Sequence, residues 1–232
     1  METTEKKYTV ENALKFKWAS VNGNLNTSRV TYLSDYLIGT KILDAGCGGG
    51  AYVEFLSNQS PLKVTGVDKY KQFLAMKPDK SIGTYVQGDI TTLPFPDKNF
   101  DCTYCFDVLE HIDDRAGIKE LSRVTSKRLI LTVPKEDNVL PNFGLTFLHY
   151  QDKTHLRNYT ETSFKKLCSG INYKSIIIFP ELPVSISNIA RASLDFKKSN
   201  LITRFCYRKL FHHLLKKTSS EVYTGLVAVI TL

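Results

Sequence analysis

Ile42-Leu43-Asp44-Ala45-Gly46-Cys47-Gly48-Gly49-Gly50-Ala51 is a short apolar run that ends in a cluster of glycines. The run predicts a buried strand, and the residues after it predict a helix over 50–58. Glycine lets the chain turn tightly and lets the backbone approach a ligand, because it has no Cβ. The segment is therefore expected to form a strand, a ligand-binding loop and a helix in succession.

Short apolar runs and helix-like stretches alternate through the rest of the chain. With the first strand at 41–44, the expected strands are 63–68, 84–87, 100–106, 128–133, 173–179 and 223–232. The expected helices between them are 69–76, 113–125 and 160–169, with helix-like patterns also near 10–19 and 28–37. This alternation predicts an α/β fold with a mostly parallel sheet and helices on both faces.

We expect one domain over residues 1–232, because no repeat or flexible linker divides the chain. To this domain belong an N-terminal helical segment, 1–39, and a helical insertion at about 184–219 before the last strand. Hydrophobic residues make up 42% of the 232 residues and charged residues 23%, which excludes collagen, coiled coil and low-complexity disorder. The chain contains no run of about 18 apolar residues, so no membrane-spanning helix is expected. The charged N-terminus is no secretory signal, so a cytoplasmic location is expected.

The net charge of +8 is concentrated in one segment, 196–217, which holds seven bases and no acids. Leucine, isoleucine and phenylalanine are interspersed among these bases. Three interpretations remain open for this segment. It could be a helical lid on the sheet, an interfacial helix that makes peripheral contact with an anionic membrane, or a surface that holds RNA phosphates.

Acidic residues at the ends of the expected strands indicate which ligand the glycine loop binds. Gly46-x-Gly48-x-x-Ala51 alone would also fit a dinucleotide. Asp68 can accept both hydroxyls of a ribose, and Asp89 can accept a hydrogen bond from an adenine amino group. Asp44 would repel a pyrophosphate but attract an ammonium group. Together these residues describe an adenosine joined to an amino acid.

Four motifs in this order resemble those of the class I S-adenosylmethionine-dependent methyltransferases. They are Leu43 to Gly50, Val67-Asp68, Gly88-Asp89-Ile90 with Leu93-Pro94-Phe95, and Phe100-Asp101 with Phe106-Asp107-Val108-Leu109-Glu110-His111. The resemblance covers roughly residues 25–135. It implies a Rossmann-like seven-stranded sheet of order 3-2-1-4-5-7-6 with strand 7 antiparallel, and S-adenosyl-L-methionine as cofactor.

The resemblance also implies a set of cofactor-binding residues. Gly46 and Gly48 would lie against the methionine moiety, Asp68 would hold the ribose, and Phe106 would line the site. The full set is Arg29, Asp44, Gly46, Cys47, Gly48, Asp68, Lys69, Asp89, Ile90 and Phe106. Arg29 belongs to a run, 26–32, that resembles the entrance segment of ubiquinone-pathway O-methyltransferases, where it would reach the cofactor carboxylate. The alternative is a solvated helix residue.

A neutral hydroxyl acceptor needs its proton removed, usually by a histidine or a carboxylate. The candidates are His155, His149 and His111, although each could instead have a structural role, with His155 and Arg157 anchoring a loop. Asp107-x-x-Glu110-His111 matches a run that binds a divalent metal in some relatives and none in many others. We expect no metal here, and the run leaves that question open.

The expected activity is methyl transfer, on oxygen, to a small and partly hydrophobic acceptor. The hydrophobic character of the acceptor is inferred from residues 138–159, which are rich in apolar and aromatic side chains. The alternative is an RNA methyltransferase that uses the basic segment 196–217. It is weaker because no RNA-binding module is recognised, so nucleic acid is not an expected partner. A third alternative is a catalytically inactive protein that binds the cofactor.

Overall fold

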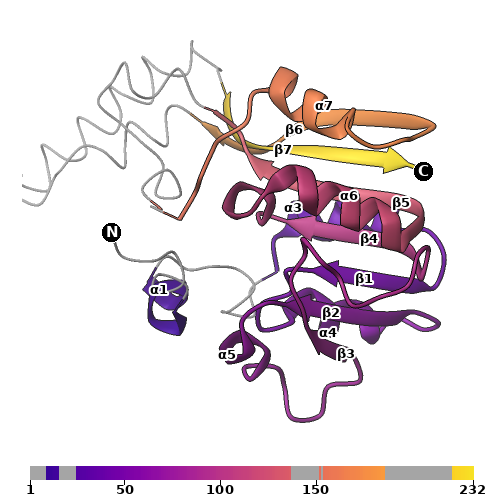
Figure 1. The fold of residues 1–232 in the computed structure, drawn as a ribbon. Helices are drawn as coiled ribbons and strands as arrows, with labels where there is room; N and C mark the ends of the chain where they lie inside the picture. Colours follow the sequence, from indigo (N-terminus) through magenta and orange to yellow (C-terminus); the bar gives the residue numbers. More distant parts are fainter. Residues whose placement is uncertain (1–8, 16–24, 137–151, 153, 186–220) are drawn as a thin grey trace, which may run out of the picture.

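A computed structural model of the chain describes residues 9–15, 25–136, 152, 154–185 and 221–232 (Figure 1). Two helices, α1 (Val10–Lys15) and α3 (Thr27–Tyr36), precede the sheet. Strands and helices then alternate: β1 (Lys41–Ala45), α4 (Ala51–Ser57), β2 (Lys63–Asp68), α5 (Lys71–Leu74), β3 (Thr84–Gln87), β4 (Phe100–Phe106), the 3-10 helix η2 (Leu109–His111), α6 (Asp114–Val124), β5 (Thr125–Pro134), α7 (Glu161–Cys168), β6 (Ser175–Ser185) and β7 (Glu221–Thr231).

The seven strands form one sheet in the order β3-β2-β1-β4-β5-β7-β6. β1 to β5 are parallel neighbours, whereas β7 lies antiparallel between β5 and β6. In Figure 1 the arrowheads of β1 and β4 accordingly point one way and that of β7 the other. The order and the antiparallel strand that the sequence predicts are confirmed.

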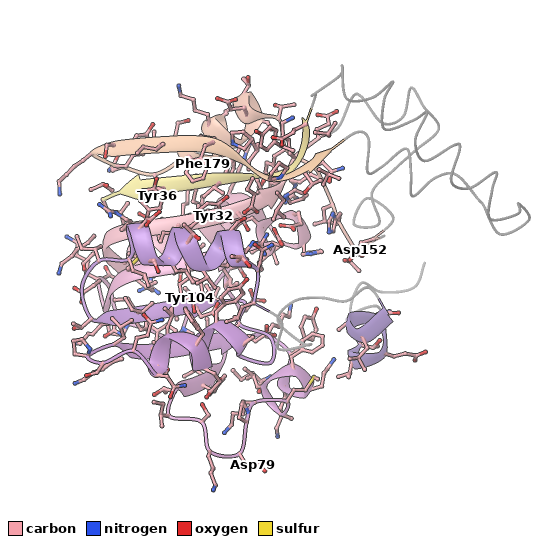
Figure 2. The ribbon with its side chains drawn as sticks, turned by 180° about the vertical axis from the view of Figure 1, so that it is seen from behind. Tyr32, Tyr36, Asp79, Tyr104, Asp152 and Phe179 are labelled. Carbon is pink, nitrogen blue, oxygen red and sulfur yellow. The ribbon has the colours of Figure 1, made fainter. Side chains whose placement is uncertain are left out.

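Alternate residues of the strands pack on opposite faces of the sheet, and each face has its own helices. Ile42 of β1 packs with α3 and α4, through residues such as Leu33 and Val53. Leu43, the next residue, packs on the other side with Leu121 of α6 and Phe164 of α7. The views from the front (Figure 1) and from behind (Figure 2) show these two layers of helices on either side of the sheet. Helices therefore cover both faces, as expected.

β6 is longer than the sequence predicts. The run was expected to end before Pro180, but the strand pairs with β7 as far as Ser185, with Glu181 opposite Gly225. The prediction was wrong because β6 lies at the edge of the sheet, where a proline leaves no ladder hydrogen bond unmade. The expected insertion at about 184–219 thus begins inside β6, and its remaining residues lie outside the described part of the chain.

Helix α3 brings the N-terminal segment against the far edge of the sheet. Asn26 caps the helix, because its side chain accepts hydrogen bonds from the backbone N–H groups of Ser28 and Arg29. Tyr32 and Tyr36 lie next to the ring of Phe179 on β6, at centroid distances of 5.3 and 6.2 Å (Figure 2). Within the described ranges, no helix has the length and apolar character needed to cross a membrane.

Candidate functional site

In the glycine loop between β1 and α4, three residues adopt backbone conformations that favour glycine. Gly46, Gly48 and Gly50 have φ angles of 85°, 54° and 82°. A Cβ on Gly46 would collide with the side chain of Val108, which follows β4. Backbone N–H groups of Gly46 and Cys47 both donate to the carbonyl of Val67, at 2.8 and 3.1 Å. The loop is therefore anchored to the end of β2 and packed against the end of β4.

Asp68, the last residue of β2, is buried and organises the loop beside it. One carboxylate oxygen accepts a hydrogen bond from the N–H of Gly48, and the other accepts one from the N–H of Tyr70, both at 2.9 Å. Burial raises the pKa of Asp68, although these two hydrogen bonds oppose the shift. Asp68 therefore lies beside the glycine loop, whose residues are expected to bind the same ligand.

Asp44 lies at the carboxyl end of β1 and is 5% exposed. Burial raises the pKa of Asp44 to about 8; a hydrogen bond from Tyr104 opposes the shift and the charge of Asp68 adds to it. Among the described residues, no ion pair involves Asp44. A buried carboxyl that lacks a cation is a suitable partner for an ammonium group brought by a ligand. Cys47 lies on the same loop, also buried.

Lys69 and Asp89 form an ion pair across the ends of β2 and β3, at 3.1 Å. Asp89 also accepts hydrogen bonds from the N–H and the hydroxyl of Thr91. Burial raises the pKa of Asp89, but these bonds and Lys69 outweigh it, so the pKa is lowered overall. Ile90 is buried in the core next to Gly117 of α6.

Arg29 of α3 reaches residues at the ends of β4 and β6. Its guanidinium lies over the ring of Phe106, 5.2 Å from the ring centroid. One nitrogen, Nη2, donates to Asp107 at 2.7 Å and to Glu181 of β6 at 3.0 Å. These two carboxylates raise the pKa of Arg29 overall, although burial alone would lower it. The alternative of a solvated helix residue is wrong, because Arg29 is 6% exposed.

Two of the three candidate histidines lie together beyond the end of β4. The rings of His111 and His155 are 4.6 Å apart and nearly perpendicular. Burial lowers the pKa of His111 to about 4, with His155 adding to the shift, and burial also lowers the pKa of His155. Arg157 donates to the carbonyls of Leu109 and Ile112, so it anchors this loop on η2. His149 lies outside the described residues.

Glu110 is buried beside these histidines, at 1% exposure. Neither of its carboxylate oxygens hydrogen-bonds to another described residue. Burial, followed by the charge of Asp107, raises the pKa of Glu110 well above its usual value. Ligand atoms of Glu110, His111 and His155 all lie within 4.8 Å of one another. This arrangement joins residues that are far apart in the sequence.

Comparisons with known proteins agree with this geometry. Residues 43–131 match the family described as a methyltransferase domain. Among curated relatives, phosphoethanolamine N-methyltransferase of Triticum aestivum is 28% identical over 106 residues, which are 44% of this chain and 21% of that protein. Ubiquinone biosynthesis O-methyltransferase of Proteus mirabilis is 32% identical over 104 residues, 40% of this chain and 42% of that protein. The chain thus spans less than half the length of either relative.

A solved structure, described as a SAM-dependent methyltransferase from Archaeoglobus fulgidus, has the same fold. Its TM-score is 0.67 at 16% identity, and the match covers 97% of this chain and all of that one. Residues 43–131 thus match a methyltransferase domain, and the chain has the fold of a SAM-dependent methyltransferase. The structure brings the sequence-predicted residues together at the ends of β1 and β2 and in the loop after β1: they are Asp44, Gly46, Cys47, Gly48 and Asp68. Their contact with the cofactor stays a prediction.

Glu181 was not predicted as a site residue, and Asp107 was considered only as a metal ligand in the run Asp107-x-x-Glu110-His111. Asp107 has a φ of 55°, which is uncommon for a residue other than glycine, and its carboxylate is held by Arg29 and Thr132. A Cβ on Gly225 would come within 2.9 Å of a Glu181 carboxylate oxygen. An acid after Pro180 and a glycine inside the last strand were the only signals. Neither identifies its partner without the sheet register.

Proposed function

We propose that this chain transfers the methyl group of S-adenosylmethionine to an oxygen atom of a small, partly hydrophobic acceptor, working as a single domain. The observation that supports this best is the juxtaposition of the glycine loop, Asp44 and Asp68 at the ends of β1 and β2. It combines a ribose-accepting carboxylate with a buried acid suited to an ammonium group. When bound there, S-adenosylmethionine supplies an electrophilic methyl group.

Each of these residues would hold a different part of the cofactor. Asp68 accepts the ribose hydroxyls while it keeps the N–H of Gly48 in place. Asp44 receives the ammonium group, and the positive φ of Gly46 lets the backbone approach the methionine moiety. Asp89 and Ile90 face the adenine, with Lys69 fixing the carboxylate of Asp89. Alignment by such contacts accounts for much of the rate enhancement of a transfer reaction.

An oxygen acceptor is supported by the two buried imidazoles next to the end of β4. Burial lowers the pKa of both His111 and His155, so both are neutral at pH 7 and able to accept a proton, but a pKa of about 4 makes His111 the weak base of the two. His149 belongs to the apolar stretch 138–159 proposed to contact the acceptor. An amine acceptor would need such a base less, since its lone pair is available when the amine is neutral.

A methyl-transfer screen tests this function directly. The full chain is incubated with S-adenosylmethionine labelled in the methyl group, against cell metabolites and, separately, total RNA. Label in a small molecule whose methyl is bound to oxygen supports the proposal, whereas label confined to RNA contradicts it. Alanine variants of His111, His149 and His155 then identify the base, because one of them should lower turnover about 100-fold without changing cofactor affinity.

We also propose that the protein acts in the cytoplasm and that the basic segment 196–217 makes peripheral contact with an anionic membrane. Each base near such a surface contributes about 1 kcal/mol, so several give reversible binding. Sedimentation with phosphatidylserine vesicles tests this. Binding at low salt that weakens when Arg204, Arg208 and Lys209 become Gln is expected. A lack of binding at low salt would favour the lid, and a shift on tRNA would favour contact with RNA.

A further inference from the structure

Gly50 is the last glycine of the loop, and α4 begins directly after it. Its φ is 82°, and it has no side chain with which to cap the helix. The N–H of Gly50 donates to the carbonyl of Cys47 at 2.8 Å, and the carbonyl of Gly50 accepts from the N–H of Glu54 at 2.9 Å. Gly50 therefore joins the loop to the first turn of α4 by hydrogen bonds on both sides, so a movement of Gly50 would displace both.

Tyr85 of β3 approaches this junction from a strand that lies at the edge of the sheet. Its hydroxyl donates to Oε1 of Glu54 at 2.7 Å, because a carboxylate can only accept. The hydroxyl oxygen is also 3.5 Å from the carbonyl oxygen of Gly50. A Cβ on Gly50 would collide with this hydroxyl oxygen. Tyr85 thus fills the space beside Gly50 and is tied to the helix that begins after it.

The carboxylate of Glu54 has a second anchor outside the loop. The hydroxyl of Ser81 donates to Oε1, the same oxygen that accepts from Tyr85. The hydroxyl oxygen of Ser81 in turn accepts from the N–H of Gly83 at 3.1 Å. Ser81 and Gly83 directly precede β3, so both the strand and the segment leading into it hold Glu54. Side chains therefore fix the first turn of α4 to the edge of the sheet, in place of the cap that Gly50 cannot provide.

The ring and the hydroxyl proton of Tyr85 are held as well. The ammonium group of Lys77 lies over the ring, 5.5 Å from its centroid. Burial, followed by the hydrogen bond to Glu54, raises the pKa of Tyr85. The hydroxyl therefore stays protonated at neutral pH and remains a donor. All of these contacts come from the protein's own side chains, so the hydroxyl is in place without a ligand.

Asp68 and Tyr85 hold opposite ends of a run of three consecutive glycines. Asp68, at the end of β2, accepts a hydrogen bond from the N–H of Gly48 at 2.9 Å. Tyr85, on the parallel neighbour β3, contacts Gly50 at the other end. A loop that is fixed at both ends loses less conformational entropy when a ligand binds, so the ligand binds more tightly.

We propose that Tyr85 and Glu54 are positioning residues that order the glycine loop for S-adenosylmethionine. This role rests on the proposed function, because it requires that the loop hold the cofactor. Both residues act through Gly50 and not by contact with the reacting atoms. Loss of the pair should therefore weaken cofactor binding and leave the chemical step unchanged. In kinetic terms, the KM for S-adenosylmethionine should rise while kcat stays close to the wild-type value.

Calorimetric titration with S-adenosylhomocysteine compares the full wild-type chain with variants of the pair. Tyr85→Phe and Glu54→Ala should each weaken binding by about 3- to 10-fold, and the double variant should lose no more than either single one. Glu54→Gln should stay within about twofold of wild type, since its amide oxygen still accepts from Tyr85. Tyr36→Phe is the matched control, because it removes a tyrosine hydroxyl from α3, where the ring lies near Phe179 (Figure 2).

Amide hydrogen exchange of the ligand-free proteins shows whether the effect is local. The amides of residues 48–50 should exchange about 3- to 10-fold faster in Tyr85→Phe than in wild type, whereas those of β5 and β7 should not change. Wild-type affinity in both Tyr85→Phe and Glu54→Ala would overturn the positioning role and leave the proposed function intact. Equal losses in Glu54→Ala and Glu54→Gln, or faster exchange throughout the sheet, would overturn it too. A wild type that binds no S-adenosylhomocysteine would contradict the proposed function itself, and this role with it.

Discussion

Replacement of Asp44 by Asn should stabilise the ligand-free protein at neutral pH. The folded-state pKa of Asp44 is about 8, against 3.8 for the free side chain. Between these values the folded state binds a proton that the unfolded state has released, so the free energy of unfolding falls as pH rises. Each pH unit corresponds to about 1.4 kcal/mol, hence the wild type loses up to about 4 kcal/mol between pH 4 and pH 7.

Asparagine mimics the protonated carboxyl at every pH, so the variant escapes this loss. Urea unfolding followed by far-UV circular dichroism at pH 5, 6, 7 and 8 measures the difference between variant and wild type. That difference should rise with pH by up to about 1.4 kcal/mol per unit. Any fixed effect of burying the amide moves the whole curve and leaves its slope unchanged.

Asp101→Asn is the matched control. Lys127 and the backbone N–H groups of Lys41 and Thr40 lower the pKa of Asp101 to about 2. Its stabilising contribution is therefore complete above pH 4 and is lost only as pH falls toward 2. The difference between this variant and wild type should stay constant from pH 5 to pH 8. A constant difference for Asp44→Asn over the same range would refute the reasoning about its burial.

Four further substitutions, at three positions, test the cofactor-binding residues and the contacts that support them. Asp68→Ala should weaken S-adenosylmethionine binding by about 10- to 150-fold in calorimetry, because charge-assisted hydrogen bonds contribute roughly 1.5–3 kcal/mol; unchanged affinity would contradict the role of Asp68. Gly46→Ala should lower the free energy of unfolding by at least about 1–2 kcal/mol, since its φ of 85° disfavours a Cβ and Val108 occupies that space; a variant as stable as wild type in urea would be inconsistent with this. Glu181→Ala should lower the free energy of unfolding by about 1–3 kcal/mol at pH 8, because the buried guanidinium of Arg29 then has one partner fewer. Glu181→Gln should lower it less, and equal losses in the two variants would count against an electrostatic role.

The sheet could be predicted from the sequence because its determinants are local. β2, β3 and β4 match the expected bounds of 63–68, 84–87 and 100–106, since each is a short apolar run with a clear stop. Thr160, the first residue of the helix expected over 160–169, caps α7. The glycine loop and Asp68 could also be assigned to one ligand in advance, because a carboxylate at the end of the second strand can accept ribose hydroxyls. The strand order came from the family resemblance.

The polar clusters could not be predicted, because their members meet only in the folded chain. Arg29 and Glu181 are 152 positions apart, and nothing near either residue indicates an ion pair. His155 was expected to be a base or a loop anchor, but its position beside Glu110 depends on how Arg157 fastens the loop to η2. β6 continues beyond Pro180 because it lies at the edge of the sheet, where the missing N–H of a proline leaves no ladder hydrogen bond unmade.

Calorimetric titration of the full chain with S-adenosylhomocysteine and, separately, with NADH tests the central claim, that Asp44, Gly46 and Asp68 bind an adenosyl amino acid. The account predicts saturable binding of one S-adenosylhomocysteine per chain, weakened at least about tenfold by Asp68→Ala, and no measurable binding of NADH. Tight binding of NADH together with no binding of S-adenosylhomocysteine would contradict it.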